Sequence, residues 1–431
     1  MKIHFIGIGG IGVSALARYY LAKGNTVTGS DLIASEITAA LKKLGAKIFI
    51  GKHKTENLPK DTDLAIYSPA VQKTNPELKR AYQIQNTKYQ IQILSYPQAL
   101  GELTKKYFTI AVSGTHGKST TAAMIGLLLA KAGFDPTVIV GTKVKEFGNS
   151  NYRAGKSKYL VIEACEYDES FLNYYPAIIV ITNIEAEHLD YFKTFNNVLK
   201  AFKKFAKKLP KDGILINEKK YKKTEKDAIK MRKILKVPGE HNVSNALAAL
   251  AVARVLKIPD KVSYQALSEY KGSWRRFEEK ECKMRDIKYK IRLISDYGHH
   301  PTQIKATLQA ARDKWPDKKI WCVYQPHQYQ RTYYLFKDFV KVFRRAPVDR
   351  LIITDIYDVA GREKKEIKEK ISSKILIGAI KKSWAAYLPK EKIVEYLKKN
   401  LRGGEVVIIM GAGDIYKLDK KFKREENKIR F

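Results

Sequence analysis

Short, almost wholly apolar runs alternate with longer stretches of mixed polarity along the whole chain. Residues 3–8 (IHFIGI) have the composition of a buried strand, and residues 11–23 carry the apolar spacing of a helix that follows it. Further strand–helix repeats continue as far as residues 105–106. This alternation predicts a small doubly wound α/β domain, because each strand is followed by a helix that can cover a parallel sheet.

A second series of apolar runs begins at residues 107–112 (YFTIAV). It continues with a glycine loop, a long helix over residues 118–132 and the segments YLVIEAC and AIIVITNI, which are nearly all apolar, as central parallel strands are. A lysine-rich helical region and an apolar helix within PGEHNVSNALAALAVARVL follow. We expect a second, central α/β domain in this part of the chain.

The pattern changes again after Gly272. Helical stretches separate four predicted strands, RLISDYG, KIWCVYQP, RLIITDIYD and EVVIIMGAGD. A chain of 431 residues is also too long for one ordinary core. We therefore predict an α/β protein of three domains, at residues 1–105, 106–272 and 273–431.

Composition argues against several classes of protein. No apolar run reaches the roughly 18–20 residues that cross a bilayer, so we expect no membrane partner. The first residues resemble a secretory signal ending in an A-x-A-like segment at residues 15–17, but the glycine spacing and a helical pattern that continues to Leu21 argue against one. The three cysteines are widely spaced without a C-x-x-C pair, which predicts neither disulfides nor a zinc site and suits a cytoplasmic location.

The chain is strongly basic, with a formal net charge of +37. Such an excess attracts polyanions. Most of it is lysine dispersed along exposed helix positions, and the densest stretch, residues 203–236, holds fourteen Lys/Arg against four Asp/Glu without the aromatic interleaving of RNA-binding segments. We predict no nucleic-acid partner, and no function that we infer requires so large a charge.

Two glycine-rich segments have the spacing of phosphate-binding loops. The first, from Gly7 to Gly12, is G-x-G-x-x-G, and Asp31 follows where a ribose-binding acid is expected. This loop alone is compatible with a nicotinamide dinucleotide site, a bare structural turn, or a site for a nucleotide-linked substrate. We favour the last interpretation, because a second loop is better suited to ATP.

That second loop runs from Gly114 to Thr120 (GTHGKST), between a predicted strand and helix. Backbone N–H groups and the positive helix end can bind phosphate there. Lys118 adds a positive charge, and the Ser119 hydroxyl can coordinate Mg²⁺. Val112 stands where the full G-x-x-x-x-G-K-S/T pattern has its first glycine. We predict that this loop binds ATP.

Polar residues follow the strands of the central domain. Glu163 ends one strand, at the edge where ligands of parallel sheets bind, and could complete an Mg²⁺ shell with Ser119. Glu166 could serve the same ion. His188 is a candidate for a second metal or for the phosphoryl oxygens, although a lone histidine is often structural.

Other polar groups lie near the last two domains. His241, Asn242 and Asn245 come just before and within a predicted helix, where their side chains could meet an adenine or cap the helix. Arg275 and Arg276 are suited to bidentate phosphate contacts. The polar groups after the C-terminal strands predict a cleft, and they are Asp296, Tyr297, His299, His300 and residues 325–332.

Taken together, these motifs resemble those of the Mur ligases, in the family's order and over essentially the whole chain. The motifs are GIGGIG, GTHGKST, EACE, TNIEAEHLD, PGEHNVSNALAA, RRFE, DYGHHPTQI, QPHQYQRT and GAGDI. The resemblance implies a Rossmann-like N-terminal domain for a UDP-sugar, a central P-loop ATPase-like domain with a parallel sheet, and a C-terminal Rossmann-like domain for the amino acid and ATP.

The resemblance also implies a cytoplasmic enzyme of peptidoglycan precursor synthesis, a monomer or homodimer. ATP and Mg²⁺ would activate the lactyl carboxylate of UDP-N-acetylmuramate as an acyl phosphate, which L-alanine then attacks. The implied catalytic residues are Lys118, Glu163, His188, His327 and Arg331, and the metal ligands Ser119, Glu163 and His188. ATP would be bound by Gly114, Thr115, His116, Gly117, Lys118, Ser119, Thr120, Asn242, Asn245, Arg276 and Asp296. The other substrates would be bound by Gly9, Gly10, Gly12, Asp31, Ser68, Tyr297, His299, His327 and Arg331.

The chain departs from the family pattern in several places. Gln328 stands where many members carry arginine, the segment between Asp212 and Pro238 is short, and Cys165 lies beside the predicted metal carboxylate, where we interpret it as a small apolar filler. Some members carry a carbamylated lysine, a role that we place on neither Lys200 nor Lys203. A related ligase that adds another amino acid or a murein tripeptide is the main alternative, ahead of a folylpolyglutamate-type ligase.

Overall fold

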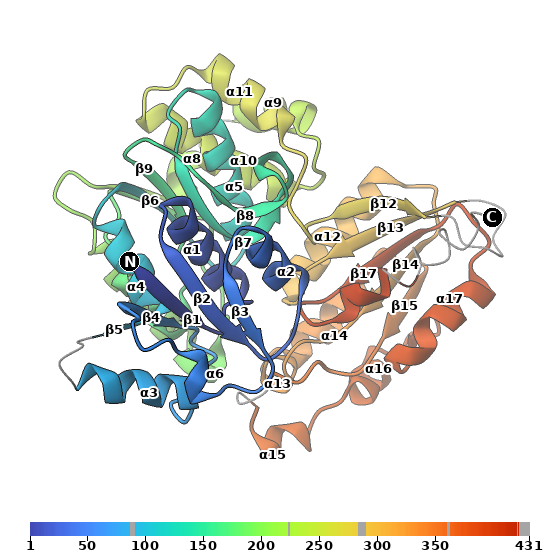
Figure 1. Cartoon of the computed structure of the whole chain (residues 1–431). Helices are drawn as coiled ribbons and strands as arrows, with labels where there is room; N and C mark the ends of the chain where they lie inside the picture. Colours follow the sequence, from blue (N-terminus) through green and yellow to red (C-terminus); the bar gives the residue numbers. More distant parts are fainter. Residues whose placement is uncertain (87–90, 223–224, 283–289, 360–362, 420, 422–431) are drawn as a thin grey trace, which may run out of the picture. The chain divides into compact units, whose positions relative to one another are not determined.

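The computed structural model describes residues 1–86, 91–222, 225–282, 290–359, 363–419 and 421. Three separate sheets follow one another along the chain (Figure 1). The residues group into two compact units: a first unit of Met1–Glu185, Asn196–Ile234 and Ser244–Tyr270, and a second unit of Ala186–Phe195, Leu235–Val243 and Lys271–Phe431. Among the described residues, no helix combines the length and apolar character needed to cross a membrane.

The N-terminal sheet has five parallel strands in the order β3-β2-β1-β4-β5. Its strands are β1 (Lys2–Ile6), β2 (Thr26–Asp31), β3 (Lys47–Ile50), β4 (Leu64–Tyr67) and β5 (Gln92–Ser95), and its helices are α1 (Ile11–Ala22), α2 (Glu36–Lys43), α3 (Pro76–Gln85) and α4 (Tyr96–Thr104), with the short 3₁₀ turn η1 (Thr55–Asn57). The strand order reverses at β1, where Gly7 begins the first glycine loop, and ligands of such sheets bind at this point.

The central sheet has six strands in the order β11-β10-β6-β9-β7-β8. They are β6 (Phe108–Ser113), β7 (Thr137–Val144), β8 (Ser150–Arg153), β9 (Tyr159–Glu163), β10 (Ile178–Ile181) and β11 (Ile214–Ile216), with only β8 antiparallel to its neighbour. The helices are α5 (Lys118–Lys131), α6 (Leu189–Phe192), α7 (Phe195–Ala206), α8 (Glu218–Tyr221), α9 (Glu225–Ile234), α10 (Glu240–Val255) and α11 (Asp260–Glu269), with 3₁₀ turns η2 (Lys145–Phe147) and η3 (Tyr167–Asn173).

The C-terminal sheet has the order β12-β13-β17-β14-β15-β16 and is parallel except for β12. Its strands are β12 (Glu278–Cys282), β13 (Ile291–Asp296), β14 (Ile320–Tyr324), β15 (Arg350–Ile353), β16 (Ala385–Tyr387) and β17 (Val406–Met410). Its helices are α12 (Pro301–Lys314), α13 (Tyr329–Tyr334), α14 (Phe336–Arg344), α15 (Lys365–Lys368), α16 (Ser373–Ile380) and α17 (Ile393–Asn400), with 3₁₀ turns η4 (Lys390–Lys392) and η5 (Ile415–Lys417). Two apolar clusters, one around Phe339 and Phe343 and one around Leu397, bury the strands.

These sheets confirm the predicted α/β fold class with its Rossmann-like outer domains and central parallel-sheet domain. The boundaries at residues 105 and 272 stay predictions. The idea that His241, Asn242 or Asn245 caps a helix is wrong, because α10 already begins at Glu240. The backbone N–H of Asn242 donates to the carbonyl of Gly239, the residue before the helix.

Candidate active site

The second glycine loop leads from β6 directly into α5, as predicted. Gly114 has φ +134°, and a Cβ atom there would overlap Thr182 Oγ1. Gly117 has φ +83°, and a Cβ atom there would overlap the side chain of Asn245. Both positions therefore require glycine. The N-terminus of α5 faces the loop, and its N–H groups and helix dipole stabilise an anion bound there.

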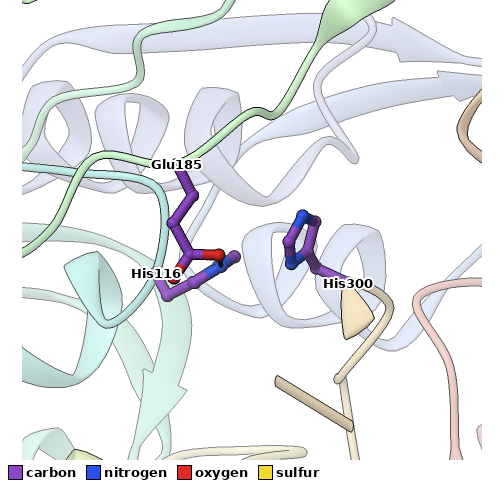
Figure 2. Close-up of side chains that lie close together, drawn as sticks. All are labelled: His116, Glu185 and His300. Carbon is purple, nitrogen blue, oxygen red and sulfur yellow. Dashed lines mark hydrogen bonds and ion pairs between the residues drawn. The ribbon is translucent and has the colours of Figure 1, made fainter. Parts of the chain in front are cut away.

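Residues after β10 hold the same loop in place. The backbone N–H groups of Thr115 and His116 donate to the main-chain and side-chain oxygens of Asn183, each at 2.9 Å. The hydroxyl of Thr182 donates to the His116 carbonyl at 2.5 Å. The side chain of His116 turns toward Glu185, with 3.3 Å between Nε2 and Oε2, as Figure 2 shows. Asn183 and Glu185 thus support the loop, a role that the sequence motif alone does not define.

The ammonium group of Lys118 lies across this loop. Its Nζ atom donates to the Gly114 carbonyl at 2.6 Å and forms an ion pair with Glu166 at 2.9 Å. Burial alone would lower the pKa of Lys118, but the nearby carboxylates, Glu166 first, outweigh it and hold that pKa above 10.5. Lys118 is therefore charged, and Glu166 compensates the charge where phosphate oxygens are expected.

Ser119 and Glu163 form the second polar pair at the loop. The Ser119 hydroxyl donates to Glu163 Oε2 at 2.8 Å, and the Gly141 N–H donates to the same oxygen at 2.8 Å. A hydroxyl and a carboxylate side by side are hard oxygen donors that fit Mg²⁺, which usually keeps several waters and phosphate oxygens as its other ligands. Burial raises the pKa of the neighbouring Cys165 thiol to about 12, so it stays protonated and is consistent with a filler.

The residues predicted to hold adenine lie in different units. Asn245 belongs to the first unit, where its Oδ1 accepts from Thr121 at 3.2 Å and lies against Gly117. Asn242 belongs to the second unit, where its amide donates to the Pro238 carbonyl at 2.7 Å. Asn245 therefore supports the phosphate loop, and adenine binding by either residue stays a prediction.

The first glycine loop is bound to the end of β2. The N–H groups of Gly7 and Ile8 donate to the Ser30 carbonyl at 2.9 and 3.0 Å, and the Gly9 N–H donates to Asp31 Oδ2 at 2.8 Å. Asp31 Oδ1 accepts from the Ile33 N–H at 3.2 Å, so both carboxylate oxygens of Asp31 already have a backbone donor, and ribose binding by this residue stays a prediction. Gly10 precedes α1, whose first turn begins at Ile11.

Ser68, a predicted substrate-binding residue, and Asn151, which was not predicted, also border this loop. Ser68 follows β4 and lies so close to Gly7 that a Cβ atom on the glycine would be 3.0 Å from Ser68 Cβ. The side chain of Asn151, from β8, donates to the Ile11 carbonyl at 2.5 Å and to Ser14 Oγ at 2.9 Å. The central sheet therefore fixes the first turn of α1, and both glycine loops belong to the first unit.

A buried carboxylate lies beneath the first loop. Glu77, in α3, is fully buried and accepts hydrogen bonds from His4 at 3.0 Å, Ser30 at 2.6 Å, His53 at 2.9 Å and Asn57 at 2.8 Å. Burial alone would raise the pKa of Glu77, but these hydrogen bonds outweigh it and lower that pKa to about 2. Ser30 joins this network to the loop.

In the second unit, Arg331 forms a buried ion pair with Glu187. The distance from Arg331 Nε to Glu187 Oε1 is 2.9 Å, and both side chains are 7% exposed. Arg331 Nη1 also donates to the carbonyl and contacts the ring of His327, at 3.0 and 3.1 Å. Although burial alone would raise the pKa of Glu187, Arg331 and neighbouring histidines hold it well below 4.5. Glu187 was not among the predicted functional residues, and its only signal is its place beside His188.

His327 and His299 lie near this pair. The His327 ring stacks on Tyr357, and its centroid is 6.1 Å from that of His299. His299 Nδ1 is 3.0 Å from the Tyr297 carbonyl oxygen. Burial, and then the charge of Arg331, hold the pKa of His299 well below 6.5, so this ring is neutral at neutral pH. The structure thus brings together the residues predicted for the amino acid.

His188 lies in the same unit, just before α6. Its φ is +56°, in the left-handed region that residues with a side chain rarely adopt. With Glu187, Asp190 and Arg331 it borders a cavity of about 10 Å³, room for about one water molecule. Because Ser119 and Glu163 belong to the first unit, a shared metal site with His188 stays a prediction.

The two neighbouring arginines differ in their surroundings. Arg275 is buried, donates to the carbonyls of Gly411 and Gly413, and has its guanidinium 4.4 Å from the Tyr416 ring centroid. Burial lowers the pKa of Arg275 to about 10. Its Nη2 group serves the fold, so Arg275 does not offer the complete fork expected for phosphate. Arg276 is half-buried, and its guanidinium lies over the Tyr297 ring.

Asp296 and Gln328 are both buried. Asp296 accepts from the N–H groups of Phe277 at 2.8 Å and Gly298 at 2.7 Å, so both of its carboxylate oxygens already have donors. Gln328 has φ +73°, and its N–H donates to the Tyr357 carbonyl at 3.0 Å. ATP binding by Asp296 stays a prediction. The backbone of Gln328 is constrained by its positive φ and by the hydrogen bond to Tyr357.

Comparison with known proteins matches the same three parts of the chain. Family models describe residues 2–108 as the Mur ligase family catalytic domain, residues 112–234 as the Mur ligase middle domain, and residues 275–413 as the Mur ligase glutamate ligase domain. UDP-N-acetylmuramate–L-alanine ligase from Acetivibrio thermocellus is 41% identical, covering 99% of this chain and 96% of the relative. The enzyme of that name from Clostridium tetani is also 41% identical, covering 98% and 97%.

Solved structures agree. The UDP-N-acetylmuramate–alanine ligase of Thermotoga maritima has a TM-score of 0.79 at 28% identity, with both chains fully covered. A murein peptide ligase of Psychrobacter arcticus has a TM-score of 0.72 at 22% identity, again over both whole chains, which shows a shared fold. Fold and site thus define a three-domain α/β protein with an ATP-type phosphate loop. The chain belongs to the Mur ligase family.

Proposed function

We propose that this chain is an ATP-dependent ligase that joins L-alanine to the lactyl carboxylate of UDP-N-acetylmuramate, releasing ADP and phosphate. The observation that carries the proposal is the 41% identity, over 99% of the chain, to a relative named for that reaction. The paired Ser119 and Glu163 support it, because this chemistry needs a metal site beside a phosphate loop. A cytoplasmic location is part of the proposal, and the wide spacing of the three cysteines, without a C-x-x-C pair, supports it.

Most residues assigned to the first step belong to the first unit, whereas Asn242, Arg276, Asp296 and His188 belong to the second. A carboxylate is a poor acyl donor, so the lactyl carboxylate must first take the γ-phosphoryl group of ATP. Loop N–H groups and Lys118 would bind the triphosphate, and Lys118 would exchange Glu166 for phosphate oxygens. Ser119 and Glu163 would hold Mg²⁺, which neutralises charge developing on the phosphoryl oxygens.

UDP-N-acetylmuramate, the substrate that carries the carboxylate, would bind with its diphosphate at the first glycine loop. Gly9, Gly10 and Gly12 would bind its diphosphate through their backbone and the start of α1. Asp31 and Ser68 border the same loop and would contact the ribose or the diphosphate. No chemistry occurs at this loop, which would serve to anchor the substrate.

The second step would use residues of the second unit. The neutral amine of alanine attacks the acyl phosphate and expels phosphate. Among the described residues, Arg331 Nη2 has no hydrogen-bond partner, because Glu187 and His327 use only Nε and Nη1. Nη2 would therefore bind the alanine carboxylate, and a neutral His299 would add no competing charge.

Release of ADP and phosphate by the full chain tests the proposal. ADP formation that requires Mg-ATP, UDP-N-acetylmuramate and L-alanine together supports it. Each reaction is repeated with glycine, L-serine or the murein tripeptide in place of alanine. Turnover with one of these donors and none with alanine would assign the chain to a different ligase of the family.

A further inference from the structure

Tyr96, the first residue of α4, lies against the start of the first glycine loop's helix. A Cβ atom on Gly12 would lie 2.9 Å from both Cζ and Oη of Tyr96. The tyrosine ring therefore contacts the backbone of Gly12 directly. Ser95 and Gln98 form a capping box at the start of α4, which fixes the position of Tyr96 on its helix.

The helix that begins at Tyr96 also packs near the strand that ends at Glu163. Helix α4 packs on η3, the segment that follows β9, and a Cβ atom on Gly101 would overlap the Asn173 carbonyl. Burial first, and then the charge of Glu163, raise the pKa of the Tyr96 phenol, so it stays protonated. Tyr96 thus contacts the backbone of Gly12, and its helix packs on the segment that follows the Glu163 strand.

The hydroxyl of Tyr96 is available to a ligand. The tyrosine is half-buried, yet its Oη has no hydrogen-bond partner among the residues that the structure describes. Tyrosine hydroxyls in such surroundings usually bond to a neighbour, as Tyr264 does to Asp227 at 2.6 Å and Tyr221 does to the Thr182 carbonyl at 2.6 Å. A protonated phenol donates to an anionic oxygen without adding a charge.

We propose that Tyr96 is a substrate-binding residue that donates a hydrogen bond to an anionic oxygen of the nucleotide sugar, where the sugar passes from the first glycine loop toward Ser119 and Glu163. This inference rests on the proposed function. The oxygen belongs to the diphosphate or to the lactyl carboxylate, and both present the same chemistry to a phenol. A neutral donor also suits a carboxylate that must act as a nucleophile, since it orients the group without forming an ion pair with it.

Substitution of Tyr96 by phenylalanine removes only the hydroxyl. A hydrogen bond to a charged group is lost, so we expect the Kd and KM of UDP-N-acetylmuramate to rise about tenfold or more. The KM of ATP and the unfolding temperature should stay close to those of the wild type, because the ring remains. Binding of UDP-N-acetylglucosamine, which lacks the lactyl group, identifies the oxygen: equal weakening indicates the diphosphate, and unchanged binding indicates the carboxylate.

Tyr264→Phe is the matched control. It also loses one hydroxyl in the first unit, but that hydroxyl bonds to Asp227, so the unfolding temperature should fall while both KM values stay unchanged. Unchanged UDP-N-acetylmuramate binding by Tyr96→Phe would overturn the inference, as would a loss of stability accompanied by equal changes in both KM values. If the wild-type chain shows no alanine-dependent turnover, the proposed function fails instead, whatever the variant does.

Discussion

Replacement of Glu187 by glutamine tests the buried ion pair with Arg331, the residue proposed to bind the amino acid. Two unit charges 2.9 Å apart attract each other by about 6 kcal/mol at an effective dielectric constant of about 20. Because Glu187 and Arg331 are both buried, removal of the carboxylate leaves the guanidinium charge without compensation. Loss of one partner of a buried pair costs about 3–5 kcal/mol. We expect Glu187→Gln to lower the unfolding temperature of the second unit by about 10 °C.

Calorimetric unfolding and steady-state kinetics measure the two consequences. The KM of alanine should rise, since Arg331 loses the partner that fixes its guanidinium, while the KM of ATP stays unchanged. Adding Arg331→Met removes the uncompensated charge, so the double variant should unfold at a higher temperature than Glu187→Gln. Glu395→Gln is the control: it breaks an exposed pair with Lys399 and should shift unfolding by about 1 °C or less. A Glu187→Gln protein as stable as the wild type, or a double variant no more stable than the single one, would refute this reasoning.

Three further substitutions address the first unit. Lys118→Ala should reduce turnover by about a hundredfold or more while calorimetry shows unchanged UDP-N-acetylmuramate binding, and full activity would contradict the ATP assignment. Gly114→Ala forces a side chain onto Thr182 and should raise the KM of ATP and lower the unfolding temperature; unaltered ATP kinetics would refute the loop geometry. Glu77 has a pKa of about 2 against 4.5 unfolded, so its ionised form contributes about 3 kcal/mol above pH 4.5, and this contribution is lost as the pH falls toward 2. The advantage of the wild type over Glu77→Gln in thermal unfolding should therefore shrink between pH 4.5 and pH 3, whereas a constant difference would contradict the pKa.

Local patterns are sufficient to predict the second glycine loop and the pairing of Ser119 with Glu163. Helix α5 begins at Lys118, as the strand–loop–helix pattern indicates. The pairing of Ser119 with Glu163 follows from a general rule, because the carboxyl ends of neighbouring parallel strands meet at one edge of the sheet. Neither feature requires knowledge of distant contacts.

The local sequence pattern does not predict contacts between residues that are far apart along the chain. Glu187 and Arg331 are 144 residues apart, and no periodicity links an acid beside one strand to an arginine in a later helix. Asn245 is suited to adenine by its chemistry, but it lies against Gly117 because α10 packs beside the loop. Arg275 has the chemistry of a phosphate ligand, yet burial against aromatic rings directs its donors to backbone carbonyls.

Most of the residues that the proposed function assigns to phosphoryl transfer belong to one unit. The first glycine loop, Lys118, Ser119 and Glu163 all belong to the first unit, and Asn151 fixes the first turn of α1 to the central sheet. Phosphoryl transfer between two substrates needs constant spacing between their binding sites, and a single packed unit provides it. Arg331 belongs to the second unit, so under the proposed function the alanine carboxylate would be bound by a residue outside the first unit. Under the proposed function, the first unit would bind the phosphates and the acid to be activated, and the second unit would supply Arg331 for the amino acid. The Tyr96 hydroxyl beside Gly12 would then bind an oxygen of the nucleotide sugar.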